Sequence, residues 1–247
     1  MNLDDLVLEV TRKCNLRCAH CMRGCSQRVT MSNGIIAKVV SQVDYVSTLT
    51  LTGGEPSLGT EVIENLVNYT RWRRDFKIGS FYVVTNGRPH NRFSRFLKAL
   101  DALYELVEEK DSCSLTISRD QFHNFDKSLL RKFWNEWGES EREYFHPENR
   151  TTYIDYAGIL NEGFAEKNQL GTKDPEQQKP WQVDEEYGYC VKDGLVYVAA
   201  NGNVVSICDI SYARTDAEAK GNVLQTPLRE IIESFCVREE APKEEAA

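Results

Sequence analysis

Short apolar segments alternate with amphipathic stretches along the first two thirds of the chain. Five segments are rich in β-branched and other apolar side chains, as expected of buried strands: residues 6–10, 48–51, 81–85, 114–118 and 151–156. Four stretches between them have the composition or apolar spacing of helices: residues 35–43, 62–67, 93–107 and 129–134. Because single helices separate the strands, right-handed crossovers predict parallel βα units. The expected fold class is α/β, a partial (βα)5-6 parallel barrel.

The last third of the chain has a different pattern. Residues 195–200 and 204–208 are apolar and flank an Asn-Gly turn signal at Asn201 and Gly202, which predicts a β-hairpin. A helix is expected at residues 228–232. These elements suggest four parts: a barrel core at residues 1–165, a polar linker at 166–186, a small extension of β-hairpin plus helix at 187–238, and a disordered acidic tail at 239–247.

Composition and charge narrow the class of protein. The chain has 247 residues, 41% of them hydrophobic and 28% charged, which is ordinary for a globular protein. No apolar run approaches the roughly 18 residues of a membrane span, and the amino terminus is acidic, so we expect a cytoplasmic protein with no membrane partner. A formal net charge of -8 argues against a nucleic-acid partner. The eight cysteines are then expected to be ligands or free thiols.

Three of the cysteines form the strongest chemical signal in the chain. Cys14, Cys18 and Cys21 follow the first predicted strand with the spacing C-x3-C-x2-C. Thiolates are soft ligands for zinc, copper(I) or iron-sulfur clusters. A structural zinc site needs a fourth ligand, whereas a [4Fe-4S] cluster on three cysteines keeps one iron open for a small molecule. Cys25 offers an alternative, since as a fourth ligand it would close the centre and make a non-catalytic iron-sulfur or zinc protein.

Further polar and glycine-rich segments follow the other predicted strands. One is the Gly53-Gly54-Glu55-Pro56 turn, and the others begin at Asn86 and at Ser118. Glycines allow the backbone to approach a ligand closely. In a parallel barrel the active site lies at the carboxyl ends of the strands. The cysteine loop and these segments are therefore expected on one rim.

The cysteine spacing together with the Gly-Gly-Glu-Pro turn resembles the radical S-adenosylmethionine superfamily, over about residues 6–165. The resemblance implies two cofactors, a [4Fe-4S] cluster and S-adenosyl-L-methionine. It implies that the glycine-rich turn, Gly53 to Pro56, holds the amino group of S-adenosylmethionine. It also assigns contacts with the carboxylate and ribose to three later residues: Asn86, Ser118 and Asp120.

The same resemblance implies an oxidoreductase that cleaves S-adenosylmethionine reductively. The 5'-deoxyadenosyl radical then abstracts hydrogen from a substrate carbon, and an external flavodoxin or ferredoxin-like donor supplies the electron. Arg119 and His123 are expected on the substrate side of the site. His123 is either a proton-transfer group or a hydrogen-bonded loop histidine.

The C-terminal part is similar to the SPASM or twitch extensions of peptide- and protein-modifying members of this superfamily. Cys190, Cys208 and Cys236 are too few for the full cysteine set, which favours a degenerate extension that has lost its cluster; the alternative is an auxiliary cluster on these three thiolates with a fourth ligand from outside. A peptide or protein is therefore the expected substrate. A small molecule or nucleotide is the alternative.

Overall fold

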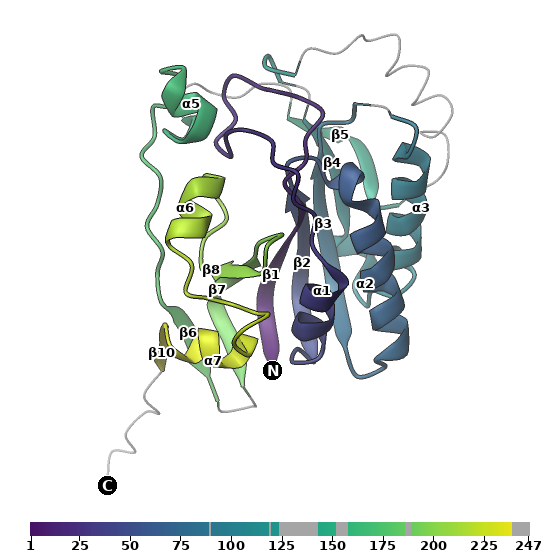
Figure 1. Ribbon diagram of the computed structural model, residues 1–247. Coiled ribbons are helices and arrows are strands. Elements are labelled where there is room, and N and C mark those ends of the chain that lie inside the picture. The colour runs from purple at the N-terminus through teal and green to yellow at the C-terminus, as the bar shows by residue number, and fades with distance from the viewer. Residues whose placement is uncertain (89, 119, 124–142, 152–157, 186–188, 239–247) are drawn as a thin grey trace, which may run out of the picture.

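A single layer of helices covers one face of the central sheet in the computed structural model (Figure 1). The structure describes residues 1–88, 90–118, 120–123, 143–151, 158–185 and 189–238. The helices are α1 (Asn33–Val40), α2 (Thr60–Trp72), α3 (Phe93–Tyr104), α5 (Gly163–Lys167), α6 (Tyr212–Ala217) and α7 (Leu228–Glu233), with 3-10 turns η1 (Pro56–Gly59) and η2 (Lys110–Ser112). The predicted helix at residues 129–134 and the tail at 239–247 lie outside the described residues.

The strands of the described residues join into one mixed sheet. They are β1 (Asn2–Thr11), β2 (Tyr45–Gly53), β3 (Lys77–Thr85), β4 (Ser114–Ser118), β5 (Phe145–Thr151), β6 (Trp181–Asp184), β7 (Cys190–Val198), β8 (Asn203–Val205), β9 (Gly221–Asn222) and β10 (Cys236–Arg238). The main order is β10-β6-β7-β1-β2-β3-β4-β5, and β1 to β5 pair in parallel. The predicted α/β class with parallel strands is therefore confirmed, while the count of βα units stays a prediction.

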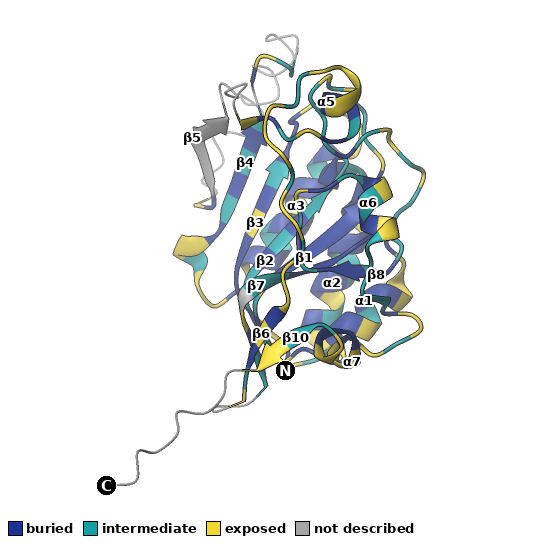
Figure 2. Cartoon of the chain, turned by 90° about the vertical axis from the view of Figure 1, so that its left-hand side faces the viewer, coloured by how far each residue is buried: buried dark blue, intermediate teal, exposed yellow. Residues whose placement is uncertain are grey.

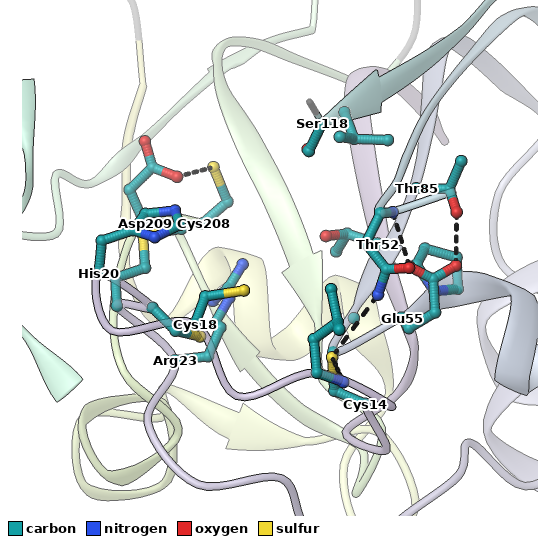
Figure 3. Close-up of a pocket in the computed structure, with 18 of the residues that line it drawn as sticks. Cys14, Cys18, His20, Arg23, Thr52, Glu55, Thr85, Ser118, Cys208 and Asp209 are labelled. Carbon is teal, nitrogen blue, oxygen red and sulfur yellow. Dashed lines mark hydrogen bonds between the residues drawn. The ribbon is translucent and has the colours of Figure 1, made fainter. Parts of the chain in front are cut away.

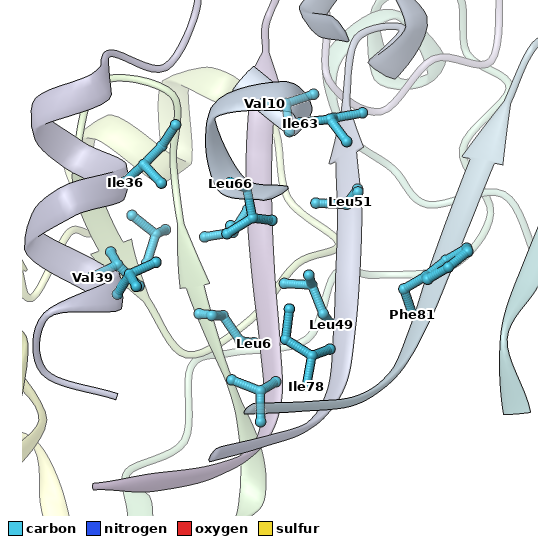
Figure 4. Packing of buried hydrophobic residues seen from close by; sticks show 14 of the residues in the cluster. Leu6, Val10, Ile36, Val39, Leu49, Leu51, Ile63, Leu66, Ile78 and Phe81 are labelled. Atoms are coloured by element: carbon cyan, nitrogen blue, oxygen red, sulfur yellow. The ribbon is translucent and has the colours of Figure 1, made fainter. Parts of the chain in front are cut away.

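Alternating side chains of the central strands build the core under the helices. In the parallel register Leu6 lies opposite Leu49 and Leu8 opposite Leu51, and all four are buried. These side chains pack with buried residues of the covering helices, among them Ile36, Val39, Ile63 and Leu66 (Figure 4). Burying each such side chain contributes about 1.5–3 kcal/mol. This packing explains why α1, α2 and α3 cover this face of the sheet.

The opposite face of the same strands is more polar. Val7 of β1 pairs with Thr50 of β2, which pairs with Tyr82 of β3. Thr50 is half-buried and Tyr82 is 39% exposed, in contrast to the buried residues that alternate with them (Figure 2). All three side chains line the cavity described below. Period-two alternation thus separates the core from the functional face.

The C-terminal strands extend the sheet. β7 pairs in parallel with β1, and β6 pairs antiparallel with β7. β6 lies inside the predicted linker at residues 166–186, and its Trp181 is fully buried with the indole N–H donating to the Leu195 carbonyl oxygen (2.9 Å). Alternation of Trp181 and Val183 with polar residues makes this short segment a strand.

The predicted hairpin is present with other bounds than expected at residues 195–200 and 204–208. Its strands are β7, which begins at Cys190, and β8, which ends at Val205, and the loop residue Gly202 has φ +90°. The described strand β5 shares only Thr151 with the strand predicted at residues 151–156, and residues 152–156 lie outside the described residues. The sequence of β5 contains a proline and charged residues and has a low intrinsic preference for a strand. It forms a strand because it pairs with β4, so a tertiary contact outweighs the local preference here.

Candidate active site

The three cysteines lie on the loop after β1 and line one cavity of about 650 Å³ (Figure 3). The cavity is also lined by residues of β2 and by residues of the segments that follow β2, β3 and β4. Further lining residues come from the part of the chain after residue 157. Cys14, Cys18 and Cys21 are each half-buried. The predicted convergence of the strand ends is present.

The donor set of the loop fits a cluster that keeps one iron open. Cys14, Cys18 and Cys21 all line the cavity, and three thiolates can hold a [4Fe-4S] cluster. A structural zinc site needs a fourth ligand. A separate group of potential ligands among the described residues is formed by His20, Asp120 and His123, whose ligand atoms lie within 4.8 Å of one another.

Burial also affects the protonation of these thiols. It raises the pKa of Cys18 to about 12, with a further contribution from Cys21 and Cys14, and it raises the pKa of Cys14. Both groups are therefore thiols at neutral pH when no metal is bound. Ligation needs thiolates, so loading the site must release protons.

Cys25 differs from the three loop cysteines in its surroundings. Its side chain is exposed, and it does not line the cavity, although Gly24 and Ser26 on either side of it do. This placement favours the prediction that Cys25 is a free thiol.

The glycine-rich turn is packed against the start of the cysteine loop. The Gly54 N–H donates to the Thr11 carbonyl oxygen and the Glu55 N–H donates to the Lys13 carbonyl oxygen, both at 2.8 Å. Gly53 has φ +158°, and a Cβ on it would lie 2.2 Å from the Thr11 oxygen. The glycines are therefore required for contact between two backbones of this chain. Their contact with S-adenosylmethionine stays a prediction.

Glu55 organises the strand ends through its carboxylate. Buried and 1% exposed, it accepts hydrogen bonds from the Ser57 N–H (3.1 Å), the Ser57 hydroxyl (2.6 Å), the Thr85 hydroxyl (2.6 Å) and the Asn86 N–H (2.8 Å). Burial raises its pKa, against these hydrogen bonds, which lower it. Pro56 begins η1 directly after it. The Glu55 side chain thus joins the turn after β2 to the end of β3.

Asn86 connects the end of β3 to the cysteine loop. Its side-chain amide donates to the Asn15 side-chain oxygen (2.9 Å) and to the Cys14 sulfur (3.9 Å). It also lines the cavity. Asn15 was not singled out by the sequence, and only its position between two predicted ligands marks it.

The residues after β4 divide between the cavity and its supporting wall. Ser118 and His123 line the cavity, while Asp120 is buried and does not. One Asp120 oxygen accepts from the Phe122 N–H (2.9 Å) and hydrogen-bonds with His123 Nδ1 (2.8 Å). Asp120 therefore orients His123, and its predicted contact with the cofactor stays untested. Arg119 lies outside the described residues.

Residues of the later part of the chain, 158–238, also line the cavity; we call this part the C-terminal segment. The lining residues include Phe164, Leu195, Cys208 and Tyr212. The Phe164 N–H donates to the Cys21 carbonyl oxygen (2.8 Å), and the Tyr212 N–H donates to the Arg23 carbonyl oxygen (3.2 Å). The C-terminal segment thus holds the cysteine loop directly.

Arg12 is the strongest link between the cysteine loop and the C-terminal segment. The side chain is 1% exposed and donates to Glu9 (2.9 Å), to Gln27 (3.0 Å) and, with two nitrogens, to both carboxylate oxygens of Asp216 (2.8 Å each). Glu9 is fully buried, whereas the Asp216 side chain is 42% exposed. Arg12 was missed because its main partner is 204 residues away.

Replacing Arg12 with glutamine should lower the free energy of unfolding by about 3 kcal/mol, because Glu9 would be left buried and charged without its cation. Asp216→Asn should cost about 1 kcal/mol or less, since solvent screens that carboxylate. Urea denaturation of the metal-free chain under reducing conditions, followed by circular dichroism, measures both. Equal losses in the two variants would contradict this division of roles.

The remaining cysteines do not gather in one place. Cys208 lines the cavity beside Leu195, while Cys190 begins β7 and lies five positions before Leu195, roughly 16 Å along the strand. Cys236 begins β10 and does not line the cavity. This arrangement favours a C-terminal segment without a cluster.

Substituting Cys190 and Cys208 together with serine should therefore leave the iron content of the reconstituted protein unchanged at about four atoms per chain, against about eight for two cubanes. Iron and sulfide analysis after anaerobic reconstitution measures this. A loss of iron in the double variant would assign a second cluster to the C-terminal segment.

Comparison with protein families gives one match. Residues 7–123 match the family model described as a 4Fe-4S single cluster domain. These residues run from β1 to the loop after β4 and include the cysteine loop. The match agrees with the [4Fe-4S] cluster predicted from the cysteine spacing. A search of curated proteins found no match.

Comparison with solved structures gives matches at low sequence identity and low TM-score. Native anSMEcpe with bound AdoMet and a peptide is 14% identical, with a TM-score of 0.43 over 97% of this chain and 85% of that one. Streptococcus suis SuiB bound to precursor peptide SuiA is 13% identical, with a TM-score of 0.41 over 92% of this chain and 64% of that one. No helix in the described part of the chain is long and apolar enough to cross a membrane.

Proposed function

We propose that the chain is a radical S-adenosylmethionine enzyme with one [4Fe-4S] cluster held by Cys14, Cys18 and Cys21. The observation that carries the proposal is the meeting of the cysteine loop and the Gly53–Pro56 turn at one cavity, with Cys25 outside it. The family model over residues 7–123 supports the same cofactor. When bound, such a cluster supplies the electron that cleaves the sulfonium of S-adenosylmethionine to a 5'-deoxyadenosyl radical.

The residues of the chain have distinct parts in this proposal. The three thiolates hold the cluster, and Asn86 donates to Cys14. Glu55 fixes the turn after β2 against β3, so that the backbone of Gly53 and Gly54 borders the cavity next to the cluster. Ser118 and His123 border the same cavity from the end of β4 and are assigned to the cofactor and substrate sides, respectively.

Phe164, Leu195 of β7 and Tyr212 line the cavity, and in this proposal their apolar and aromatic side chains limit the access of water to it. Exclusion of water protects a reactive radical from side reactions. The likeness of the C-terminal segment to SPASM or twitch extensions supports a peptide or protein substrate, from which the radical would abstract a hydrogen atom. The closed iron-sulfur or zinc alternative is disfavoured by the exposure of Cys25.

Anaerobic reconstitution with iron and sulfide tests the function. Dithionite-reduced protein should consume S-adenosylmethionine and release 5'-deoxyadenosine and methionine, measured by chromatography. A colourless, zinc-loaded protein that leaves S-adenosylmethionine intact would overturn the proposal.

A further inference from the structure

Arg23, two residues after Cys21, is a buried cation that no described carboxylate contacts. The residue is 8% exposed. In the described ranges no carboxylate oxygen lies within 4.0 Å of its guanidinium. One nitrogen, Nη1, donates to the Ile210 carbonyl oxygen (2.8 Å), and the guanidinium lies 5.3 Å from the centre of the Tyr197 ring. A guanidinium carries five N–H groups, so most of its donors are not used in this way.

A buried charge of this kind is costly unless an anion meets it. Glu9 acts on Arg23 through its charge and not by contact: its Oε2 accepts from Arg12 Nε and from the Ala200 N–H, both at 2.9 Å, and no described donor, Arg23 included, hydrogen-bonds to its buried Oε1. Both oxygens of Asp216 accept from Arg12. Glu9 therefore offsets part of the Arg23 charge, while the unused N–H groups of Arg23 are available to a ligand.

The position of Arg23 in the cavity indicates which ligand. Its side chain lies with Cys18, Cys208 and Asp209 on one side of the cavity, and Thr52 and Glu55 lie on the other (Figure 3). The glycine-rich turn that is assigned to S-adenosylmethionine borders the second side. Arg23 thus faces the part of the cavity that is left for the substrate.

We propose that Arg23 binds a carboxylate of the substrate at the C-terminal side of the cavity. The proposal rests on the function proposed above and narrows its substrate to a peptide that carries an acidic side chain or a free C-terminus near the reacting carbon. A guanidinium matches a carboxylate with two parallel hydrogen bonds. The exposed carboxylate of Asp209 borders the same side and disfavours a dense polyanion such as a nucleotide triphosphate.

The wild-type protein tests this without any substitution. Anaerobically reconstituted protein with S-adenosylmethionine is titrated, by calorimetry, with N-acetylglutamate N-methylamide and with the matched glutamine compound. A second pair, N-acetylalanine and its amide, presents a C-terminal carboxylate instead. One acid should bind at least tenfold more tightly than its neutral partner, and the pair that discriminates identifies the source of the carboxylate. Equal binding within both pairs would overturn the proposal.

Three variants then assign the preference to Arg23. Arg23→Gln should reduce the acid-over-amide preference to about one, Arg23→Lys should keep part of it, and Arg28→Gln, a control at an exposed arginine on the same loop, should keep all of it. Iron content and circular dichroism confirm that the variants are folded and loaded. A preference that persists in Arg23→Gln would contradict the assignment.

S-adenosylmethionine itself carries a carboxylate, so its affinity is measured for the same variants. We expect the affinity for S-adenosylmethionine to be unchanged in Arg23→Gln. If this affinity fell as much as the affinity for the capped acidic compound, Arg23 would be assigned to the cofactor and the proposal would be overturned. The failure of the proposed function is a separate result: it would appear as absent 5'-deoxyadenosine in the wild-type protein, whereas this inference fails only through the binding preferences.

Discussion

Replacing any one of Cys14, Cys18 and Cys21 with alanine should remove the cluster and abolish release of 5'-deoxyadenosine. Two thiolates cannot hold the cubane that three hold, and the structure places no other cysteine of the loop in the cavity. Iron and sulfide analysis together with the visible absorption of the reconstituted protein measures the loss.

Cys25→Ala is the matched control, because it removes a thiol from the same loop. It should keep about four irons per chain and the full rate of S-adenosylmethionine cleavage. If Cys25→Ala lost its cluster while one of the other three variants kept it, the assignment of ligands would be wrong and the closed centre would be favoured.

The second large effect is expected for Gly54→Ala. A Cβ at this position would lie 2.5 Å from the Lys13 carbonyl oxygen and 2.8 Å from its carbonyl carbon. Both are backbone atoms directly before Cys14, so the cysteine loop must shift to accept even one methyl group. Overpacking of this kind destabilises a folded structure by about 1–3 kcal/mol. We therefore expect the variant to lose most of its cluster and at least 90% of its S-adenosylmethionine cleavage.

Gly34→Ala provides the comparison, since its Cβ would meet its nearest neighbours at an ordinary 3.7 Å. This helical substitution should be neutral or slightly stabilising. Calorimetry with S-adenosylmethionine and iron analysis distinguish two causes of failure in Gly54→Ala. A variant that keeps its four irons but no longer binds S-adenosylmethionine would show that the glycine meets the cofactor instead of the loop.

The sequence was sufficient for features in which a local pattern determines a local structure. The apolar segments at residues 48–51 and 114–118 became β2 and β4, and the crossover rule then brought their carboxyl ends to the cysteine loop. The rim of the site follows from these two steps. Motif spacing alone marked Cys14, Cys18 and Cys21.

Features that depend on distant partners could not be predicted. The expected contact of Glu55 with the cofactor stays a prediction, but nothing in the sequence indicated that its carboxylate would accept from Thr85 and Asn86, 30 and 31 residues further along. β6 was assigned to a linker because its four residues, two of them polar, are too few to show a clear alternation of apolar and polar side chains in the sequence. Only the structure shows that Trp181 is buried and that the segment is a strand. Likewise, no pattern in the sequence indicated that Asp120 would hydrogen-bond with His123.

The pairing of β1 with both β2 and β7 has a consequence for how the protein matures. β1 precedes β7 in the chain, so one of its edges stays unpaired until residue 198 has been synthesised. An open strand edge invites association with other chains, and pairing across so long a separation is slow. Arg12 and the cysteine loop gain their C-terminal partners later still, since these are Asp216 and Tyr212. Nascent chains should therefore acquire iron only after residue 216 has been synthesised, and expression at low temperature or with chaperones should raise the yield of loaded protein more than extra iron does.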